Sequence, residues 1–351
     1  YAVWRNMISL LSDRVVVGEL PIRAGVRCLI LGPSRDAPES TGGMLALWNE
    51  SATSTDAVLE AHLGSGAMWL VDKFGNRTQL QEATEQEAKS SPGTVVAGGA
   101  TGTGVEASNT PSATVRVIAG PSPVFIEGID VEFARLVASF RVTPEFLAST
   151  TQRKDVSVQF DNPWPYPISG QLSIVEPMGS AVSNDGLDRS WKIVPRVHRF
   201  AAGPGERVSL PVSVAFGGLE EAGRRDFVFS LDIAGERRVT AIKIRSPIDI
   251  GLRNLKLELS AAQSPRSDGL DVVVEAQITN VGDTSVDIEL TAFAPKQPRA
   301  GAAIGGLLPG HQAIRRFVFP RGAATLRGQR VIVSLTDRDG GARLNASVVV
   351  P

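Results

Sequence analysis

Cysteine is almost absent from this sequence, and its scarcity excludes several kinds of site. The single cysteine, Cys28, leaves no partner for an internal disulfide and no ligands for a cysteine-based zinc cluster. Cys28 lies in the apolar run "VRCLILG", where we expect a buried thiol rather than a nucleophile. One cysteine is compatible with either a cytoplasmic or an exported bacterial protein.

Charge of one sign and long apolar runs are lacking too. The 36 basic and 37 acidic residues give a formal net charge of −1. No basic stripe stands out, so we expect no nucleic-acid partner. No apolar run approaches the roughly 18 residues that span a bilayer, so we expect no membrane-spanning segment. The sequence opens at Tyr1 without an initiator methionine or a signal peptide, so we expect a piece of a longer protein.

Short apolar runs with period-two alternation, broken by Gly, Pro, Asn and Asp, fill the sequence from residue 15 onward. This pattern indicates β-strands. Residues 131–137 fit a short helix or a strand equally well. At the start of the chain, four apolar residues share one helical face: Val3, Met7, Leu10 and Leu11. The sequence therefore predicts an all-β chain with a short N-terminal helix.

Two proline-bounded joints, "RVTPEFLAST" and "RSPIDIG", mark domain boundaries. They predict three β-sandwich domains in tandem, and the last two have the size of an immunoglobulin-like sandwich. The predicted domains are residues 1–143, 144–247 and 248–351. Within the first, residues 90–112 are rich in Gly, Ser and Thr, which predicts a mobile excursion between strands.

An internal repeat supports two similar domains. "VSVQFDN", which ends at Asn162, parallels "VVVEAQITN", which ends at Asn280. Each Asn is followed fifteen residues later by a proline, and then by "PGERVSLPVSV" in the first copy and "PGHQAIRRFVF" in the second. The same order of strands twice in succession predicts tandem domains of one fold.

The repeat unit, a strand ending in Asn followed by a turn, an amphipathic strand and Pro-Gly, resembles known modules. It is similar to the immunoglobulin-like domains appended to secreted bacterial glycosidases and surface proteins, including the α-galactosidase-associated and adhesion-type domains. The resemblance covers residues 150–351.

The first part of the chain resembles another region of such enzymes. "YAVWRNMISLLSD", "GMLALWNES", "MWLVDKFGNRTQL" and "GPSPVFIEGID" are similar to the C-terminal region of bacterial barrel glycoside hydrolases. There the last helix of a (β/α)₈ barrel is followed by a small β-sandwich that packs against the barrel. The matching positions are Trp48, Asp72 with Gly75 and Asn76, and residues 120–125. The barrel itself is missing from this sequence, so no catalytic residue is carried over.

Few residues offer chemistry. Glycosidases use two carboxylates about 5 to 10 Å apart, and three carboxylates are embedded in apolar strand-and-turn sequence: Asp72, Glu127 and Asp130. We favour turn acids that cap backbone N–H groups. His62, His198 and His311 fall in three different predicted domains, so we expect no metal site. The "LTDRDGG" segment favours a hairpin turn, with a calcium site as the alternative. We expect no cofactor.

Aromatic residues make up only 6% of the chain, yet "DNPWPYPISG" places Trp164 and Tyr166 two residues apart. With Trp191, these rings predict a carbohydrate-binding platform, and the alternative, which we favour, is a plug between domains.

Two functions fit the sequence. The first is a non-catalytic C-terminal accessory region of a secreted bacterial glycoside-hydrolase-like protein, serving as a spacer, docking or carbohydrate-proximal module. The alternative is a structural or adhesive cell-envelope protein. The expected partners are a polysaccharide or cell-surface glycan, an upstream barrel domain or other protomers. The expected location is extracellular or in the cell envelope.

Overall fold

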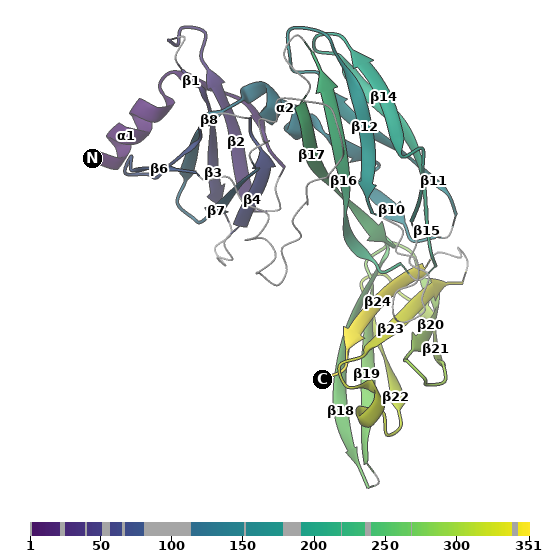
Figure 1. Cartoon of the computed structure of the whole chain (residues 1–351). Coiled ribbons are helices and arrows are strands. Elements are labelled where there is room, and N and C mark those ends of the chain that lie inside the picture. The colour runs from purple at the N-terminus through teal and green to yellow at the C-terminus, as the bar shows by residue number, and fades with distance from the viewer. Residues whose placement is uncertain are drawn as a thin grey trace.

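The chain folds into three β-sandwich domains in tandem, with a short helix at the N-terminus (Figure 1). The predicted all-β fold class is thereby confirmed. The predicted mobile excursion at residues 90–112 lies outside the residues that the structure describes. The computed structural model describes residues 2–21, 25–38, 41–50, 57–64, 67–80, 114–150, 152–177, 191–218, 220–235, 240–267, 269–338 and 343–351.

The first domain is built on a six-stranded antiparallel sheet with the strand order β1-β2-β3-β8-β5-β6. Helix α1 (Ala2–Leu11) covers one face, and the other face is covered by helix α2 (Val131–Ser139) and a two-stranded ladder. The strands of the sheet are β1 (Arg14–Glu19), β2 (Val26–Pro33), β3 (Gly43–Asn49), β5 (Trp69–Val71), β6 (Arg77–Gln79) and β8 (Val124–Ile129). The ladder consists of β4 (Ala57–His62) and β7 (Thr114–Ala119).

Successive side chains along each strand point to opposite faces of the sheet, so the first domain has two cores, one on each face. Cys28 belongs to the core under the ladder, and burial raises the pKa of its thiol to about 12, so the prediction of a buried thiol is confirmed. On the opposite face, Met7 and Leu10 of α1 pack over Met44 and its neighbours. Because α1 presents its predicted apolar face to this sheet, the N-terminal helix is fixed to the first domain.

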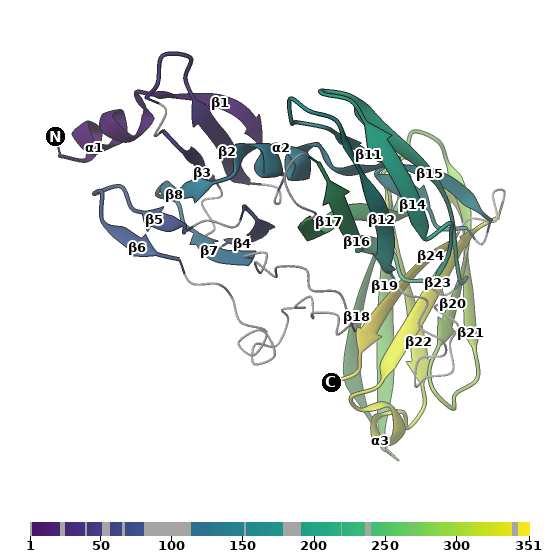
Figure 2. The same cartoon turned by 45° about the horizontal axis from the view of Figure 1, so that its top comes forward.

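Helix α2 is shared by two domains. Asp130 caps it by accepting a hydrogen bond from the backbone N–H of Phe133, at 3.1 Å. Ala134 belongs to the core of the first domain and Leu136 to the core of the second. The ribbon of α2 accordingly lies between the two sandwiches (Figure 2). Residues two positions apart, such as Ala134 and Leu136, point to nearly opposite sides of a helix but to the same side of a strand. A helix over residues 131–137 therefore lets this segment face both cores.

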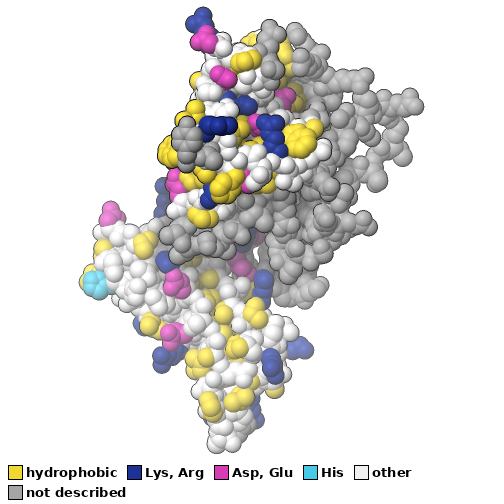
Figure 3. Space-filling view, turned by 90° about the vertical axis from the view of Figure 1, so that its left-hand side faces the viewer, with side chains coloured by type: hydrophobic (Ala, Val, Ile, Leu, Met, Phe, Trp, Pro, Cys, Tyr) yellow, Lys and Arg dark blue, Asp and Glu magenta, His cyan; other side chains and the backbone are white. Residues whose placement is uncertain are grey.

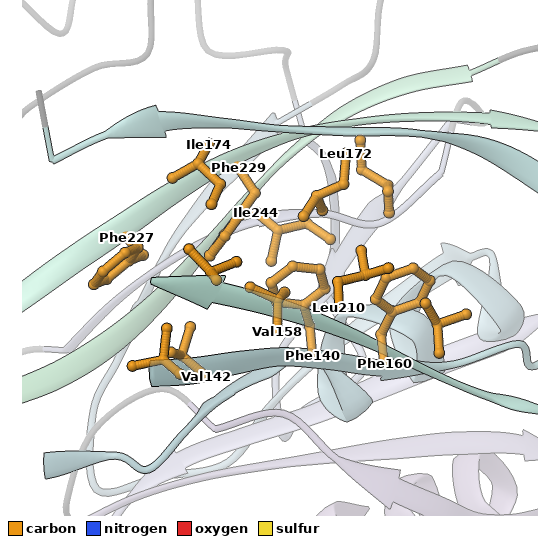
Figure 4. Close-up of a cluster of buried hydrophobic side chains, with 14 of the residues drawn as sticks. Phe140, Val142, Val158, Phe160, Leu172, Ile174, Leu210, Phe227, Phe229 and Ile244 are labelled. Carbon is orange, nitrogen blue, oxygen red and sulfur yellow. The ribbon is translucent and has the colours of Figure 1, made fainter. Parts of the chain in front are cut away.

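The second sandwich packs a four-stranded sheet, β13-β15-β11-β9, on a five-stranded one, β10-β17-β16-β12-β14. Aromatic rings fill its core, among them Phe140, which stacks on Phe160 at a centroid distance of 5.6 Å (Figure 4). The predicted boundary at residues 143–144 falls between β9 and β10, which both pair with strands of this sandwich. The strands are β9 (Arg141–Thr143), β10 (Phe146–Ala148), β11 (Lys154–Asp161), β12 (Ile168–Glu176), β13 (Trp191–Val194), β14 (Val197–Ala202), β15 (Arg207–Phe216), β16 (Gly223–Ala234) and β17 (Thr240–Gly251).

The third sandwich packs a three-stranded sheet, β18-β19-β22, on a four-stranded one, β21-β20-β23-β24. The predicted boundary at residues 247–248 falls within β17, which continues to Gly251. The elements are β18 (Leu255–Arg266), β19 (Gly269–Asn280), β20 (Val286–Phe293), β21 (Ala300–Leu307), β22 (Gln312–Phe319), α3 (Ala323–Leu326), β23 (Arg330–Asp337) and β24 (Arg343–Val349).

The two asparagines of the repeat occupy the same structural position. The Asn162 side chain, at the end of β11, donates hydrogen bonds to the backbone carbonyls of Tyr166, Ala202 and Gly203 and accepts one from the backbone N–H of Trp164. Both asparagines are buried.

Asn280, at the end of β19, repeats this arrangement with other residues. Its Nδ2 donates to the carbonyls of Thr284 (2.7 Å) and Leu307 (2.8 Å), and its Oδ1 accepts from the N–H of Gly282 (3.0 Å). In both copies the partners within the turn are the residues two and four positions after the Asn. The repeat found in the sequence therefore reflects a buried amide that ties a turn to the end of another strand; we call this arrangement the asparagine corner.

We predict that Asn280→Ala lowers the free energy of unfolding by about 2–4 kcal/mol, because two carbonyls and one N–H lose their buried partner. The third sandwich contains no Trp or Tyr, so unfolding is best followed by circular dichroism and calorimetry. Gln329→Ala, which removes an exposed side-chain amide from the same sandwich, is the control and is expected to change stability by less than about 0.5 kcal/mol. Equal stability of the two variants would contradict the prediction.

Candidate functional site

Trp164 and Tyr166, two of the predicted carbohydrate-binding residues, lie together at the junction of the first two domains. The Trp164 side chain is only 8% exposed and meets Phe133 of α2 edge to face, with ring centroids 5.2 Å apart. Tyr166 lies 6.4 Å from Trp164 in a stacked orientation and is half-buried. The Trp164 ring thus fills the space between α2 and the second sandwich.

Trp191, the third predicted residue, lies elsewhere. It is buried at the start of β13, where its ring packs on Phe216 at 4.8 Å and on Phe227 at 5.7 Å. Trp191 pairs with Phe216 at one end of β15, whereas the strand that leads to Trp164 pairs with Arg207 at the other end. Nine residues of strand separate the two ends, about 30 Å at 3.3 Å per residue. The structure therefore brings Trp164 and Tyr166 together and keeps Trp191 apart from them.

Carbohydrate binding by Trp164, Tyr166 and Trp191 stays a prediction. A sugar stacks on the face of an aromatic ring, and both indole rings are covered by protein in this structure. Of the three rings, that of Tyr166 is the least buried.

The three carboxylates singled out in the sequence have structural partners. Asp72 Oδ1 accepts hydrogen bonds from the backbone N–H groups of Phe74 and Asn76, and a further hydrogen bond from the Asn76 side chain, the largest cause, helps hold the pKa of Asp72 below its usual value. Asp130 caps α2. The prediction of turn acids is thereby confirmed for Asp72 and Asp130. Glu127 instead lies within strand β8 and forms an ion pair with Arg77 at 2.8 Å.

The histidines and the predicted hairpin turn build no metal site in the described part of the chain. His198 lies in the second sandwich and His311 in the third, and the side chain of His62 lies outside the described residues. Across the described ranges, no group of three or more His, Cys, Asp or Glu side chains could hold a metal ion. Asp339 of the alternative calcium site also lies outside those ranges.

Helix α1 exposes two large apolar side chains beside the face that packs on the sheet, a feature that was not predicted from the sequence. Trp4 is 71% exposed and Ile8 is 63% exposed. They lie four residues apart and so share one helical face. The signal was present in the sequence, because Trp4 and Ile8 fall off the face formed by Met7 and Leu10. Among the helices that the structure describes, none is long and apolar enough to cross a membrane.

Two further exposed aromatic residues extend this surface. Trp69 of β5 projects to the α1 side of the sheet, the side that also buries Val71. Phe74 lies in the turn after β5, and its carbonyl accepts a hydrogen bond from the Asn6 side chain of α1. Figure 3 looks onto this end of the molecule, where hydrophobic side chains gather among basic ones. We call Trp4, Ile8, Trp69 and Phe74 the N-terminal aromatic face.

Two basic side chains, Arg14 and Lys73, contact residues in or next to the N-terminal aromatic face. The Arg14 side chain, at the start of β1, donates to the carbonyl of Leu10 at 3.1 Å and lies 4.0 Å from Glu127. Arg14 thus joins the last turn of α1 to the centre of the sheet. Lys73 lies 5.4 Å from the centroid of the Phe74 ring, a cation–π distance.

The second and third sandwiches are joined by hydrogen bonds around Asn345. This β24 residue is 1% exposed, and its Nδ2 donates to the carbonyls of Gly218 (3.1 Å) and Glu220 (2.9 Å) in the second sandwich. The N–H of Ala222 donates in return to the carbonyl of Asn345 at 2.8 Å. Asn345 therefore fixes a loop of one sandwich to a strand of the other.

Two more contacts cross the same joint. The N–H of Arg343 donates to the carbonyl of Ser149 at 2.7 Å. Arg330 lies 3.8 Å from the carboxylate of Glu221. Only residues 252–254 connect β17 to β18. The short connection and the hydrogen bonds across the joint link the two sandwiches by more than the chain itself.

Comparison with known proteins gives no family: no protein-family model matches the chain, and neither does any curated protein. Distant likenesses to solved structures include red sea bream transglutaminase (11% identity, TM-score 0.26), covering 60% of this chain and 31% of that one. Others are a Parabacteroides merdae β-glucuronidase (9%, TM-score 0.23, 56% and 28%) and the Pseudomonas aeruginosa CupB2 chaperone (13%, TM-score 0.20, 56% and 93%). The chain spans about a third of the transglutaminase's length. With TM-scores this low, the likenesses carry no information on function.

We predict that Trp164→Ala lowers the free energy of unfolding by about 3–5 kcal/mol, because the variant leaves a cavity between α2 and the second sandwich. Trp164→Phe keeps a ring against Phe133 and should cost less, as measured by urea unfolding. A loss below about 1 kcal/mol for Trp164→Ala would contradict the packing role. Glycan-array binding by the unmodified chain that survives in Trp164→Phe and Trp164→Ala would show that this loop is not a sugar platform.

We predict that Asn345→Ala loosens the joint between the second and third sandwiches, because two buried carbonyls lose their donor. Small-angle X-ray scattering should show a broader distribution of interatomic distances, and the amides of Ala222 and Arg343 should exchange faster with solvent. Val349→Ala, an exposed change on the same strand, is the control. Identical scattering and exchange in the two variants would refute the role of Asn345.

Proposed function

We propose that this chain is the non-catalytic C-terminal accessory region of a secreted bacterial glycoside-hydrolase-like protein. In this proposal the first domain docks on an adjoining barrel domain through the N-terminal aromatic face. The two immunoglobulin-like sandwiches then act as a spacer that carries the enzyme near its polysaccharide or cell-surface glycan, outside the cell or in its envelope.

The observation that carries the proposal is an apolar surface of α1 that is wider than the sheet covers. Met7 and Leu10 pack on the sheet, and beside them Trp4 and Ile8 are exposed. Burying two large apolar side chains of this kind against a second body is favourable. Exposed aromatic clusters rimmed by polar residues also mark contact sites between proteins. The sequence resemblance supplies the identity of the second body, because in that family the corresponding helix belongs to the barrel.

The second candidate is a structural or adhesive surface protein. The joint around Asn345 favours it, because hydrogen bonds between successive sandwiches suit a load-bearing or presenting role. In that case the N-terminal aromatic face would contact another protomer instead of a barrel.

The test compares this chain with the full-length protein. Replacing Trp4 and Ile8 together by Ala should change the stability of the chain alone by less than about 0.5 kcal/mol, since both side chains are exposed. In the full-length protein the same pair should lower the melting temperature by several degrees, because a buried contact is lost.

The control pair, Val281→Ala with Ile314→Ala, removes exposed apolar side chains from the third sandwich and should leave both proteins unchanged. A sequence upstream of Tyr1 that encodes no (β/α)₈ barrel with a pair of carboxylates would rule out the accessory role. Loss of self-association in the Trp4/Ile8 pair would favour the second candidate.

A further inference from the structure

One end of the third sandwich carries an excess of positive charge. Successive strands of this sandwich are antiparallel, and β24 meets the second sandwich at its start, around Asn345. The turns after β18, β20 and β22 therefore lie at the ends of these strands that point away from Asn345 (Figure 1), and Arg330, directly after the last of them, reaches back to Glu221. We call the described residues of these turns, 266–267, 269–271, 294–299 and 320–329, the distal end.

The two ends of this sandwich differ in their numbers of basic and acidic residues. The distal end holds five basic residues and one acidic residue, Asp271, and the neighbouring Asp268 lies outside the described residues. The described residues of the turns near the joint, 252–254, 281–285, 308–311 and 338, hold two arginines and one aspartate. The five basic side chains of the distal end are all exposed: Arg266, Lys296, Arg299, Arg321 and Arg327.

The acid that the structure describes at the distal end is already engaged. Asp271 is mostly buried; one of its carboxylate oxygens accepts a hydrogen bond from the backbone N–H of Arg321 at 2.9 Å, and the other lies 3.8 Å from Arg266. Asp271 thus ties the turn after β22 to the turn after β18 through the backbone and lies next to the guanidinium of Arg266. On the third turn, Arg299 lies over the Phe293 ring at 5.1 Å. Contacts within the fold therefore hold Arg266 and Arg299, and the five cations are spread over three turns.

We propose that the distal end is a docking surface for an acidic polysaccharide that bears carboxylate or sulfate groups. Four of its five cations are arginines, whose planar fork donates two parallel hydrogen bonds to such groups. Cations on separate turns suit the successive charges of a polymer better than one small anion. The choice of a polysaccharide among polyanions rests on the proposed function.

The residues of the third sandwich argue against one other polyanion. This sandwich contains no Trp or Tyr. A single-stranded nucleic acid is usually bound by stacking of its bases on aromatic rings. Anionic vesicles, which exposed cations bind without aromatic rings, are separated from the polysaccharide by the experiment. An acidic sugar requires only the arginine forks that are present.

The experiment measures binding of the whole chain to polygalacturonate, dextran sulfate and uncharged dextran by affinity electrophoresis, at low and at physiological salt. We expect binding to at least one of the two charged polymers, weaker at higher salt, and none to dextran. In Lys296→Gln/Arg299→Gln/Arg327→Gln the affinity should fall about 10-fold or more. The control, Arg153→Gln/Lys192→Gln/Arg199→Gln, removes three exposed cations from the second sandwich and should bind as the unmodified chain does.

Equal loss in the two triple variants would overturn the proposal, because net charge alone would then explain the binding. Unchanged binding by the distal variant would overturn it as well, provided that circular dichroism shows both variants folded. Absence of binding to both charged polymers, or binding only to an oligonucleotide or to anionic vesicles, would refute the acidic polysaccharide. None of these results bears on the accessory role, which is tested separately by the stability of the full-length protein.

Discussion

The asparagine corner is the interaction on which the internal structure of the second and of the third sandwich depends. The end of a strand leaves backbone N–H and C=O groups that must find partners before they can be buried. Asn162 and Asn280 supply these partners from one side chain, so neither turn can shift without leaving buried carbonyls unpaired. In the second sandwich the same corner holds the backbone N–H of Trp164. It therefore also places the ring that meets helix α2.

Contacts between domains extend this principle along the chain. The Trp164 ring touches α2, and α2 contributes side chains to the cores of the first and second domains. Between the second and third sandwiches, Asn345 again uses a buried amide to satisfy two carbonyls. One joint is made by apolar packing and the other by hydrogen bonds. Because both joints use buried groups, each resists bending more than a flexible linker would.

The local pattern of the sequence was enough to predict the fold class, the N-terminal helix and the repeat, because each depends on neighbouring residues. Pairing between distant strands was not visible: the proline at residue 144 marks a turn, but β9 joins β11 of the second sandwich by long-range hydrogen bonds. Burial of Trp164 depends on Phe133, a residue of the preceding domain. The exposure of Trp4 could have been inferred, since this residue lies beside the predicted apolar face of the helix and not on it.

The two ends of the chain differ in the physics of the contact that each can make. The N-terminal aromatic face offers apolar area, whose burial is largely independent of salt and favours a lasting contact. The distal end offers exposed cations, whose attraction is screened by salt and favours a reversible one. The joint around Asn345 and the shared helix α2 hold these surfaces apart on one connected body. Under the proposed function, a lasting contact at one end and a reversible one at the other would keep an attached domain close to a charged polymer.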